Sequence, residues 1–176
     1  MTIHRIRLLG DPILRAKCEP ITRPGSTAVR VIMDDMRETL RDWQARFGGG
    51  RGIAAPQIGA PVRVVYIDMG EPWPLINPEI IDIGNEDFEV WDDCFSFPNL
   101  LVRVSRAYRI RVRYQDLKGD WSEIEVEGDR NQGTVMIAEP AVAAKVSGPH
   151  LPLGEQVRVR LVSADFSTRS VSFELA

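Results

Sequence analysis

Hydrophobic residues recur at steps of three and four positions along one stretch of the N-terminal part of the chain. The recurring residues are Val29, Ile32, Met33, Met36, Leu40, Trp43 and Phe47. This spacing places them on one face of an α-helix. Ser26 or Thr27 is a candidate N-cap, and three consecutive glycines from Gly48 end the pattern. The stretch therefore predicts a long amphipathic helix whose Met and Trp residues belong to the core.

Further along the chain, short apolar or alternating runs replace the helical pattern. Residues 62–67 and 78–83 predict strands, and the prolines at 72, 74 and 78 predict a loop between them. From residue 100, apolar residues alternate with arginines up to residue 114, which is typical of a strand with one solvated face. A turn at residues 119–120 leads back into a further strand over 121–126.

The last part of the chain has short alternating runs only. They lie near residues 134–138, 141–146, 156–162 and 171–175, with a turn expected over 165–169. Three or four closely spaced short strands predict part of a small β-barrel. We therefore expect two parts, residues 1–128 and a β-rich tail over 129–176.

Composition narrows the class of protein. The chain has 176 residues and a net charge of −3, which fits one folded domain with a small appendage and gives no overall electrostatic case for nucleic-acid or membrane binding. It lacks an apolar run of the roughly 20 residues that span a bilayer, and its first residues lack the apolar region of a secretory signal. Cys18 and Cys94 lie far apart, so at least one thiol is expected to be available as a ligand.

Two stretches of the sequence with several basic residues are candidate nucleic-acid sites. Five arginines lie between Arg103 and Arg113. No pattern of stacking aromatics accompanies them, so a solvated strand face is the favoured interpretation. Residues 130–176 carry five basic and four acidic residues, which is not a basic surface.

Two motifs carry candidate chemistry. Residues 50–57 read GRGIAAPQ, in which small residues let the backbone approach a partner closely and Gln57 is the one long uncharged polar side chain. A plain glycine-rich turn would explain an isolated G-x-G. Residues 92–98 read DDCFSFP, in which Cys94 is either a small buried residue or a metal ligand.

Together these motifs resemble the peptide deformylases over residues 1–128. The first motif has every fixed position of G-x-G-[I/L]-A-A-x-Q, whereas the second keeps Cys94, Ser96 and Pro98 of the family's pattern, with Asp92, Asp93 and Phe95 replacing Glu, Gly and Leu of E-G-C-L-S. The GDPILR run at residues 10–15 and the R-V-x-Y-x-D-x-x-G run at 111–119 also agree. The resemblance implies an α+β fold with antiparallel sheets around a long N-terminal helix.

The resemblance further implies a cytoplasmic hydrolase that removes formyl from N-formylmethionyl peptides or nascent chains with one divalent metal, iron or zinc. Its implied metal ligand here is Cys94. Its implied oxyanion-stabilising groups are Gln57 and the backbone N–H of Phe95. Its implied substrate-binding residues are Gly50, Gly52, Ile53 and Arg106.

The sequence departs from the family after Gly128. Deformylases carry an H-E-x-x-H helix there, which supplies two metal ligands and the acid/base glutamate, but this chain has no such motif. Its histidines are His4 and His150, and the second lies between prolines in a predicted loop. We therefore expect an incomplete metal site and little or no activity. A non-catalytic peptide-binding domain is the alternative function.

The tail adds another alternative. Residues 130–176 weakly resemble the C-terminal OB-like end of RNB-type exoribonucleases, which suggests an RNA-binding module although nucleic acid is not the favoured partner. Without the metal-binding helix, residues 1–128 have an apolar face that needs a cover. Residues 135–137, 157–161 and 171–175 are expected to pack on that face or to mediate a homodimer.

Overall fold

The computed structural model describes residues 1–128, 132–137, 142–149, 151, 156–165 and 170–176. Its helices are the 3₁₀ turns η1 (Pro12–Arg15) and η2 (Ala55–Ile58) and the α-helix α1 (Thr27–Phe47). Its strands are β1 (Gly52–Ala54), β2 (Val64–Asp68), β3 (Pro72–Ile83), β4 (Asp87–Asp92), β5 (Val102–Ala107), β6 (Arg109–Gln115), β7 (Trp121–Glu127), β8 (Gln132–Ile137), β9 (Val142–Ser147), β10 (Val159–Asp165) and β11 (Ser170–Leu175). The predicted α+β class is confirmed. No helix in the described part of the chain is long and apolar enough to cross a membrane.

Helix α1 has the caps that the sequence predicts. The Ser26 hydroxyl accepts a hydrogen bond from the Val29 N–H at 3.4 Å, and Gly48 ends the helix in the left-handed conformation with φ 71°. The apolar stripe faces inward, and Met36 and Leu40 have no exposed surface. The helix is therefore held by its packing on the sheet as well as by its caps.

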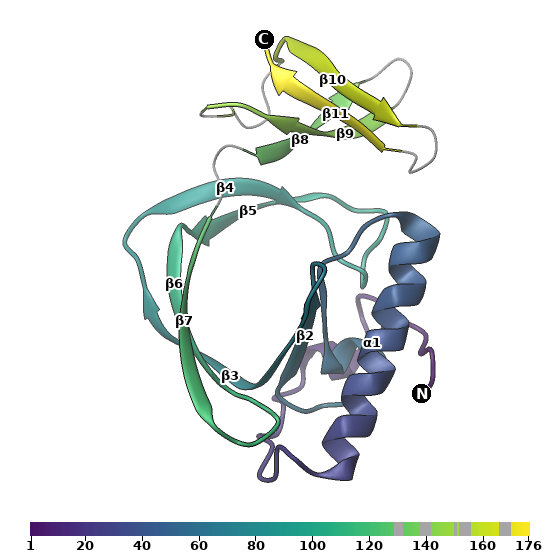
Figure 1. Ribbon diagram of the computed structural model, residues 1–176, viewed down its shortest axis with the longest axis vertical. Helices are drawn as coiled ribbons and strands as arrows, with labels where there is room; N and C mark the ends of the chain where they lie inside the picture. The colour runs from purple at the N-terminus through teal and green to yellow at the C-terminus, as the bar shows by residue number, and fades with distance from the viewer. Residues whose placement is uncertain (129–131, 138–141, 150, 152–155, 166–169) are drawn as a thin grey trace.

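A five-stranded antiparallel sheet in the order β1-β2-β3-β6-β7 forms the body of residues 1–128. Helix α1 lies beside β2 (Figure 1) and buries the side chains of one sheet face, among them Ile53, Val64 and Ile76. Strands β4 and β5 form a separate two-stranded hairpin. Figure 1 shows this hairpin arching above the curved sheet.

The prediction of a loop around residues 72–78 is wrong, because β3 runs through all three prolines. Pro72 and Pro74 pair with β2 in the part of β3 that comes before its pairing with β6. Because no strand is paired on the β6 side of these two residues, no ladder hydrogen bond there requires the N–H that proline lacks. Pro78 lies in the register shift between Ile76 and Glu79. Asn77 in the same shift has φ 51°, and its side chain bonds the Ile21 backbone.

The single arginine-rich strand predicted over residues 100–114 is two strands in different sheets. Strand β5 pairs with β4, whereas β6 pairs with β3 and β7. Cross-strand carboxylates face the arginines, in the pairs Arg103–Glu89, Arg106–Asp92, Arg109–Asp82, Arg109–Glu125 and Arg113–Glu79. A solvated strand face with paired charges accounts for this stretch.

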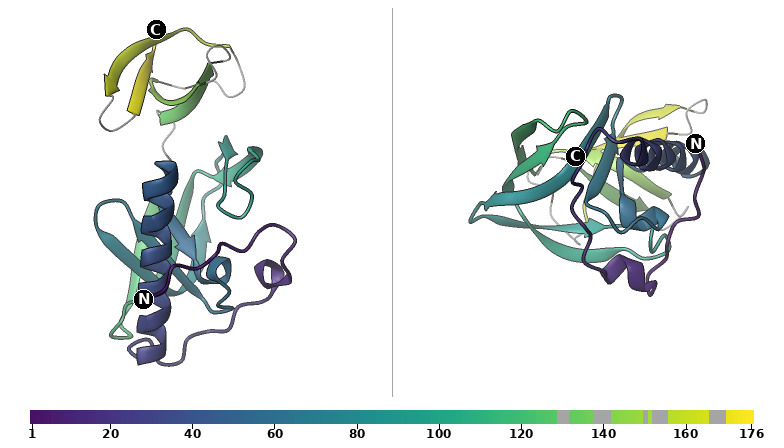
Figure 2. Two further views of the ribbon diagram at one scale, coloured as in Figure 1. Left: turned by 90° about the vertical axis from the view of Figure 1, so that its right-hand side faces the viewer. Right: turned by 90° about the horizontal axis from the view of Figure 1, so that it is seen from below.

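The tail forms a four-stranded sheet in the order β10-β11-β9-β8, as its alternating pattern predicts. Its β9–β11 pair is parallel, so the chain does not fold as a simple meander. Figures 1 and 2 show this sheet beyond the β4–β5 hairpin at one end of the molecule. The predicted turn over 165–169 falls mostly outside the described residues. The domain division at residue 128 stays a prediction.

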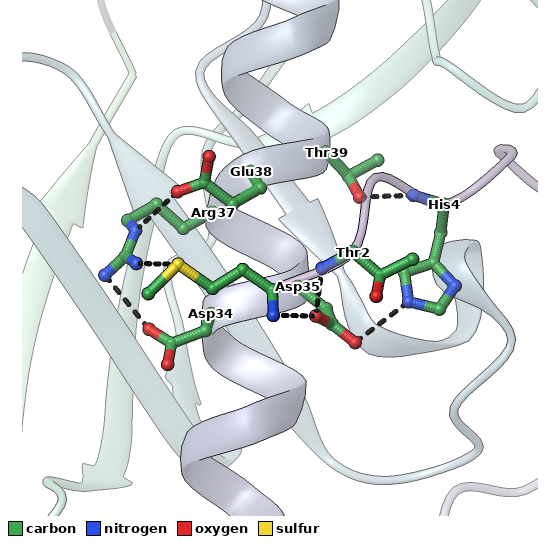
Figure 3. A network of polar contacts seen from close by, with 8 residues as sticks. Thr2, His4, Asp34, Asp35, Arg37, Glu38 and Thr39 are labelled. Atoms are coloured by element: carbon green, nitrogen blue, oxygen red, sulfur yellow. Dashed lines mark hydrogen bonds and ion pairs between the residues drawn. The ribbon is translucent and has the colours of Figure 1, made fainter.

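Polar contacts tie the N-terminal segment to α1 (Figure 3). His4 Nε2 lies 2.9 Å from Asp35 Oδ2, and the Thr2 N–H donates to Asp35 Oδ1 at 2.7 Å. The His4 N–H donates to the Thr39 hydroxyl at 3.0 Å. Burial acts to raise the pKa of Asp35, but the hydrogen bonds from His4 and Thr2 outweigh it, so that the pKa lies below its ordinary value.

Asp35→Asn is expected to lower the free energy of unfolding by about 1 kcal/mol near pH 7, because it removes the charged partner of these donors. A carboxyl whose folded-state pKa is lowered stabilises the fold above its unfolded pKa, close to 3.8. That contribution is lost as the pH falls through the folded-state pKa. Urea unfolding at several pH values should therefore show the difference between variant and wild type shrinking below about pH 4.

Asp34→Asn is the matched control. Asp34 is the neighbouring helix residue and makes an exposed ion pair with Arg37 at 3.0 Å. Such surface pairs contribute less than about 1 kcal/mol. An Asp35→Asn effect that is equal to the control, or that is the same at low and neutral pH, would contradict the role of Asp35.

Candidate active site

The glycine-rich motif begins where α1 ends, and Gly50 is held tightly there. Its φ is +111°, and a Cβ at this position would lie 2.5 Å from the Phe95 ring. Phe95 stacks on Trp43 with ring centroids 4.5 Å apart. The Gln44 side-chain amide donates to the Gly50 carbonyl at 2.9 Å. Gly50 is therefore required by backbone conformation and by space.

Strand β1 is an edge of the five-stranded sheet. The Asp68 N–H donates to the Arg51 carbonyl at 2.8 Å, which directs the backbone groups of Ile53 towards β2 in the alternating ladder. The N–H and C=O of Gly52 then point to the open edge. The Ile53 side chain is 2% exposed and belongs to the core, so neither its side chain nor its backbone groups face the open edge.

Gln57 joins the two motifs. Its Oε1 accepts the Ala54 N–H at 2.9 Å, which orients the amide. Its Nε2 then lies 3.4 Å from Cys94 Sγ and 3.3 Å from the Ser96 hydroxyl. Ser96, which the site prediction omitted, is 5% exposed. Its position two residues after Cys94, in the cysteine motif, is the sequence feature that indicates a place in the site.

A cleft of about 470 Å³ opens beside Cys94. It is lined by Leu9, Asp92, Asp93, Cys94, Phe97, Leu100, Val102, Val104 and Arg106. Arg106, the implied substrate-binding arginine, lines this cleft, but its guanidinium pairs with Asp92 across the hairpin. The sequence did not indicate Leu9, whose N–H donates to the Ser96 carbonyl at 2.8 Å.

Of the predicted site residues, the structure brings four together. Gly50, Gln57, Cys94 and Phe95 form one cluster through the contacts above. Gly52 and Ile53 lie on the adjoining edge strand. The nearby phenol of Tyr66 has its pKa raised by burial, but it belongs to the core cluster beneath α1 and has no part in the cleft.

The donor set does not fit the metal that the resemblance implies. The described residues include no group of three or more His, Cys, Asp or Glu side chains that could hold an ion. Protein metal centres of the hydrolytic type use about three protein ligands, and Cys94 supplies one. His4 contacts Asp35 beside α1, and His150 lies outside the described residues. We therefore derive no catalytic step through a metal.

Comparison with known proteins identifies the relationship. Residues 3–134 match the family model for polypeptide deformylase. The chain belongs to the peptide deformylase family. The peptide deformylase of Thermotoga maritima is 38% identical over 127 residues, which cover 72% of this chain and 74% of that protein. The peptide deformylase of Heliobacterium modesticaldum is 42% identical over 121 residues, which cover 68% of this chain and 76% of that protein.

Solved deformylase structures agree with this fold. The crystal structure of the Thermotoga maritima enzyme superposes with a TM-score of 0.66 at 36% identity, covering 73% of this chain and 84% of that one. The Ehrlichia chaffeensis peptide deformylase in complex with actinonin gives a TM-score of 0.65 at 29% identity, covering 73% and 77%. The deformylase likeness thus spans the first three quarters of the chain.

The remaining quarter has a different relative. Residues 125–176 match the model of the RNase II-type exonuclease C-terminal S1 domain. The two matched segments overlap at residues 125–134, where β7 ends and β8 begins. The last part of this deformylase-family chain, which includes β8–β11, is therefore similar to a second family model.

Gly50→Ala is expected to lower the free energy of unfolding by about 2–3 kcal/mol, because the new Cβ meets the Phe95 ring and the positive φ disfavours an L side chain. Chemical denaturation measures this loss. The same substitution made in a Phe95→Ala background is expected to cost at least about 1 kcal/mol less, since the steric clash is gone and the φ penalty stays.

Gly49→Ala is the control for this pair. No atom lies within 4 Å of a Cβ built at Gly49, and its φ is not positive. The control is expected to change stability by less than about 0.5 kcal/mol. An equal Gly50→Ala cost with and without the Phe95 ring would show that the ring does not restrict Gly50.

Proposed function

We propose that this chain is a peptide-deformylase-like protein with little or no formyl-hydrolase activity, and that it binds N-formylmethionyl peptides without processing them. Its family acts on formylated nascent peptides, and such chains in the cytoplasm are its proposed partners. The observation that carries the proposal is the contact of Gln57, three residues after the end of β1, with Cys94 on the cleft, while the described residues include no group of three or more potential metal ligands.

Peptide binding follows from the edge strand. An extended peptide can add to β1 by pairing its backbone with the outward N–H and C=O of Gly52. The absence of a side chain at Gly52 lets β1 itself lie close to β2, because a Cβ there would lie 3.0 Å from the Tyr66 carbonyl oxygen. The cleft beyond β1 is lined mainly by apolar side chains, such as Val102 and Val104, which suit an apolar first residue such as methionine.

The lack of hydrolysis follows from the groups around Cys94. Hydrolysis of a formamide needs an activated water, a group that moves its proton and donors for the oxyanion. The sequence has no H-E-x-x-H motif to hold a metal and supply the acid/base group. The Gln57 amide is a candidate oxyanion donor, but its Nε2 is directed at Cys94 Sγ and the Ser96 hydroxyl.

An N-formyl-Met-Ala-Ser peptide is expected to shift the Gly52 amide resonance of the wild-type protein and to release formate at least about 100-fold more slowly than with a metal-loaded deformylase. Two-dimensional NMR and a coupled formate assay measure these outcomes. A peptide N-methylated at the backbone position that pairs with Gly52 is the matched control, because it cannot donate to the strand edge. That control should leave the resonance unshifted.

The two parts of the proposal fail separately. Formate release by the wild type that disappears in Cys94→Ala would disprove the inactivity, whatever the binding result. Equal shifts with the methylated and unmethylated peptides, or no shift with either, would disprove binding at β1.

Added Zn²⁺ or Fe²⁺ is expected to leave the alkylation rate of Cys94 within about twofold of its value in chelator, because a single thiolate does not complete a hydrolytic metal site. Iodoacetamide labelling followed by mass spectrometry reports this site. Cys18 is the internal control, since it is a second free thiol of the same chain. Protection of Cys94 but not of Cys18 by a stoichiometric metal would overturn the expectation.

RNA binding through β8–β11 is the second candidate, and the S1-domain match favours it. The charges oppose it, because Arg160 on β10 is paired with Glu174 on β11. Salt-dependent binding of single-stranded RNA that is lost in Arg160→Glu would support this candidate over peptide binding.

A further inference from the structure

The edge of β1 that faces away from β2 gives a ligand few backbone groups to pair with. Outward-facing N–H and C=O groups recur at every second residue of a strand. An extended peptide paired with Gly52 therefore continues towards Gly50 in one direction and towards Ala54 in the other. Side chains of the protein itself close both of these neighbouring positions.

Ala54 is closed by the side chain of Gln57. The Ala54 N–H donates to Gln57 Oε1 at 2.9 Å, so this donor is already paired and is not open to a ligand. Gln57 is itself held in place, because its Nε2 lies 3.4 Å from Cys94 Sγ and 3.3 Å from the Ser96 hydroxyl. A ligand therefore cannot extend its backbone pairing to Ala54.

Gly50 is closed by Phe95 and Gln44. The Cζ and Cε1 atoms of the Phe95 ring lie 2.5 and 2.9 Å from the position of a Cβ on Gly50, so the ring fills the space beside this α-carbon. The Gly50 carbonyl accepts a hydrogen bond from the Gln44 amide at 2.9 Å. The φ of Gly50, +111°, also departs from that of extended backbone. Pairing therefore does not extend to Gly50 while the ring is in this place.

An aromatic stack on α1 holds the Phe95 ring against Gly50. The ring stacks on Trp43, with centroids 4.5 Å apart and an angle of 29° between the planes. The centroid of Trp43 lies 4.4 Å from that of Phe47, and Trp43 Cδ1 lies 3.4 Å from the same Cβ position of Gly50. The place of the Phe95 ring is thus set by side chains at the C-terminal end of α1.

We infer, on the basis of the proposed peptide binding at β1, that Phe95 is a specificity-determining residue whose ring keeps ligands off Gly50 and confines backbone pairing to Gly52. An internal segment of a polypeptide adds to a sheet edge through several successive backbone pairs, which this edge does not offer. The end of a peptide needs fewer such pairs, because its terminal side chain enters the cleft. The ring therefore favours peptide ends over extended internal segments.

Two-dimensional NMR of the wild type and of Phe95→Leu, each titrated with N-formyl-Met-Ala-Ser, tests this role. Leucine lacks the two ring atoms that lie against Gly50 but keeps an apolar side chain. In the wild type the peptide is expected to shift the Gly52 amide and to leave the Gly50 amide unshifted. In Phe95→Leu both amides are expected to shift, and the dissociation constant is expected to fall at least about threefold because one more backbone hydrogen bond forms.

Phe47→Ala is the matched control. Phe47 contacts the same Trp43 ring, but none of the three atoms nearest to the Cβ position of Gly50 belongs to it. Its side chain is 56% exposed, so the variant is expected to fold. The control should behave as the wild type does. A Gly50 shift in the control as large as in Phe95→Leu would show that the Phe95 ring is not what closes Gly50.

Failure of this role and failure of the proposed function are read from different resonances. A wild-type Gly52 amide that does not shift disproves peptide binding at β1. A wild-type Gly50 amide that shifts, or one that stays unshifted in Phe95→Leu, overturns the role of Phe95. A wild type that binds no peptide, beside a Phe95→Leu variant whose Gly50 amide shifts, disproves the proposed function and supports closure by the ring.

Nuclear Overhauser contacts between the Phe95 ring and the Gly50 α-protons of the wild type decide the matter if Phe95→Leu does not fold. Contacts that persist at saturating peptide support the role of the ring. Contacts that are lost when the peptide binds overturn it, because the ligand then reaches Gly50 in spite of Phe95.

Discussion

The packing of α1 on one face of the five-stranded sheet is the contact on which the rest of residues 1–128 depends. Met36 and Leu40 lose all exposed surface in this contact, as does Ile76 on β3. Each such side chain contributes about 1.5–3 kcal/mol when removed from water. The contact also places the end of α1 beside the glycine-rich motif, where Gln44 bonds the Gly50 carbonyl. The packing of α1 on the sheet therefore also positions the glycine-rich motif of the site.

The proposed role rests on a site in which hydrogen bonds between protein groups connect the two motifs. Ala54, Gln57, Cys94 and Ser96 form a chain of hydrogen bonds within protein alone. These hydrogen bonds hold the edge strand β1 and the cleft beside Cys94 in position without a metal ion. A peptide-binding edge needs only backbone groups and an apolar cleft, whereas hydrolysis needs several ionisable groups at one point. The proposed function follows from this difference, because the described residues include an edge strand and a cleft but no group of three or more potential metal ligands.

The face of β3 and β7 that α1 does not cover carries exposed apolar side chains, namely those of Ile80, Ile83 and Val126. A sheet face that carries apolar side chains needs a covering layer, whereas the charged face of β3, β6 and β7 does not. Helix α1 supplies one layer, and after residue 128 the chain forms a sheet of its own with Ala144 and Val146 buried inside it. On β10 of the same tail sheet, Leu161 and Val162 are 55% and 58% exposed.

The sequence by itself determined the features that depend on near neighbours: the bounds of α1, through Ser26 and Gly48, and the glycine-rich and cysteine motifs that mark the family. Tertiary structure alone decided the features that depend on distant partners. β3 passes through its prolines because β6 joins it only at Ile76, and the arginines of β5 and β6 find carboxylates on strands far away in the sequence. Gln57 and Cys94 are 37 residues apart and meet only through folding. Caps and periodicity act over one or two turns of chain, whereas strand partners, ion pairs and uncovered faces follow from how the whole sheet is assembled.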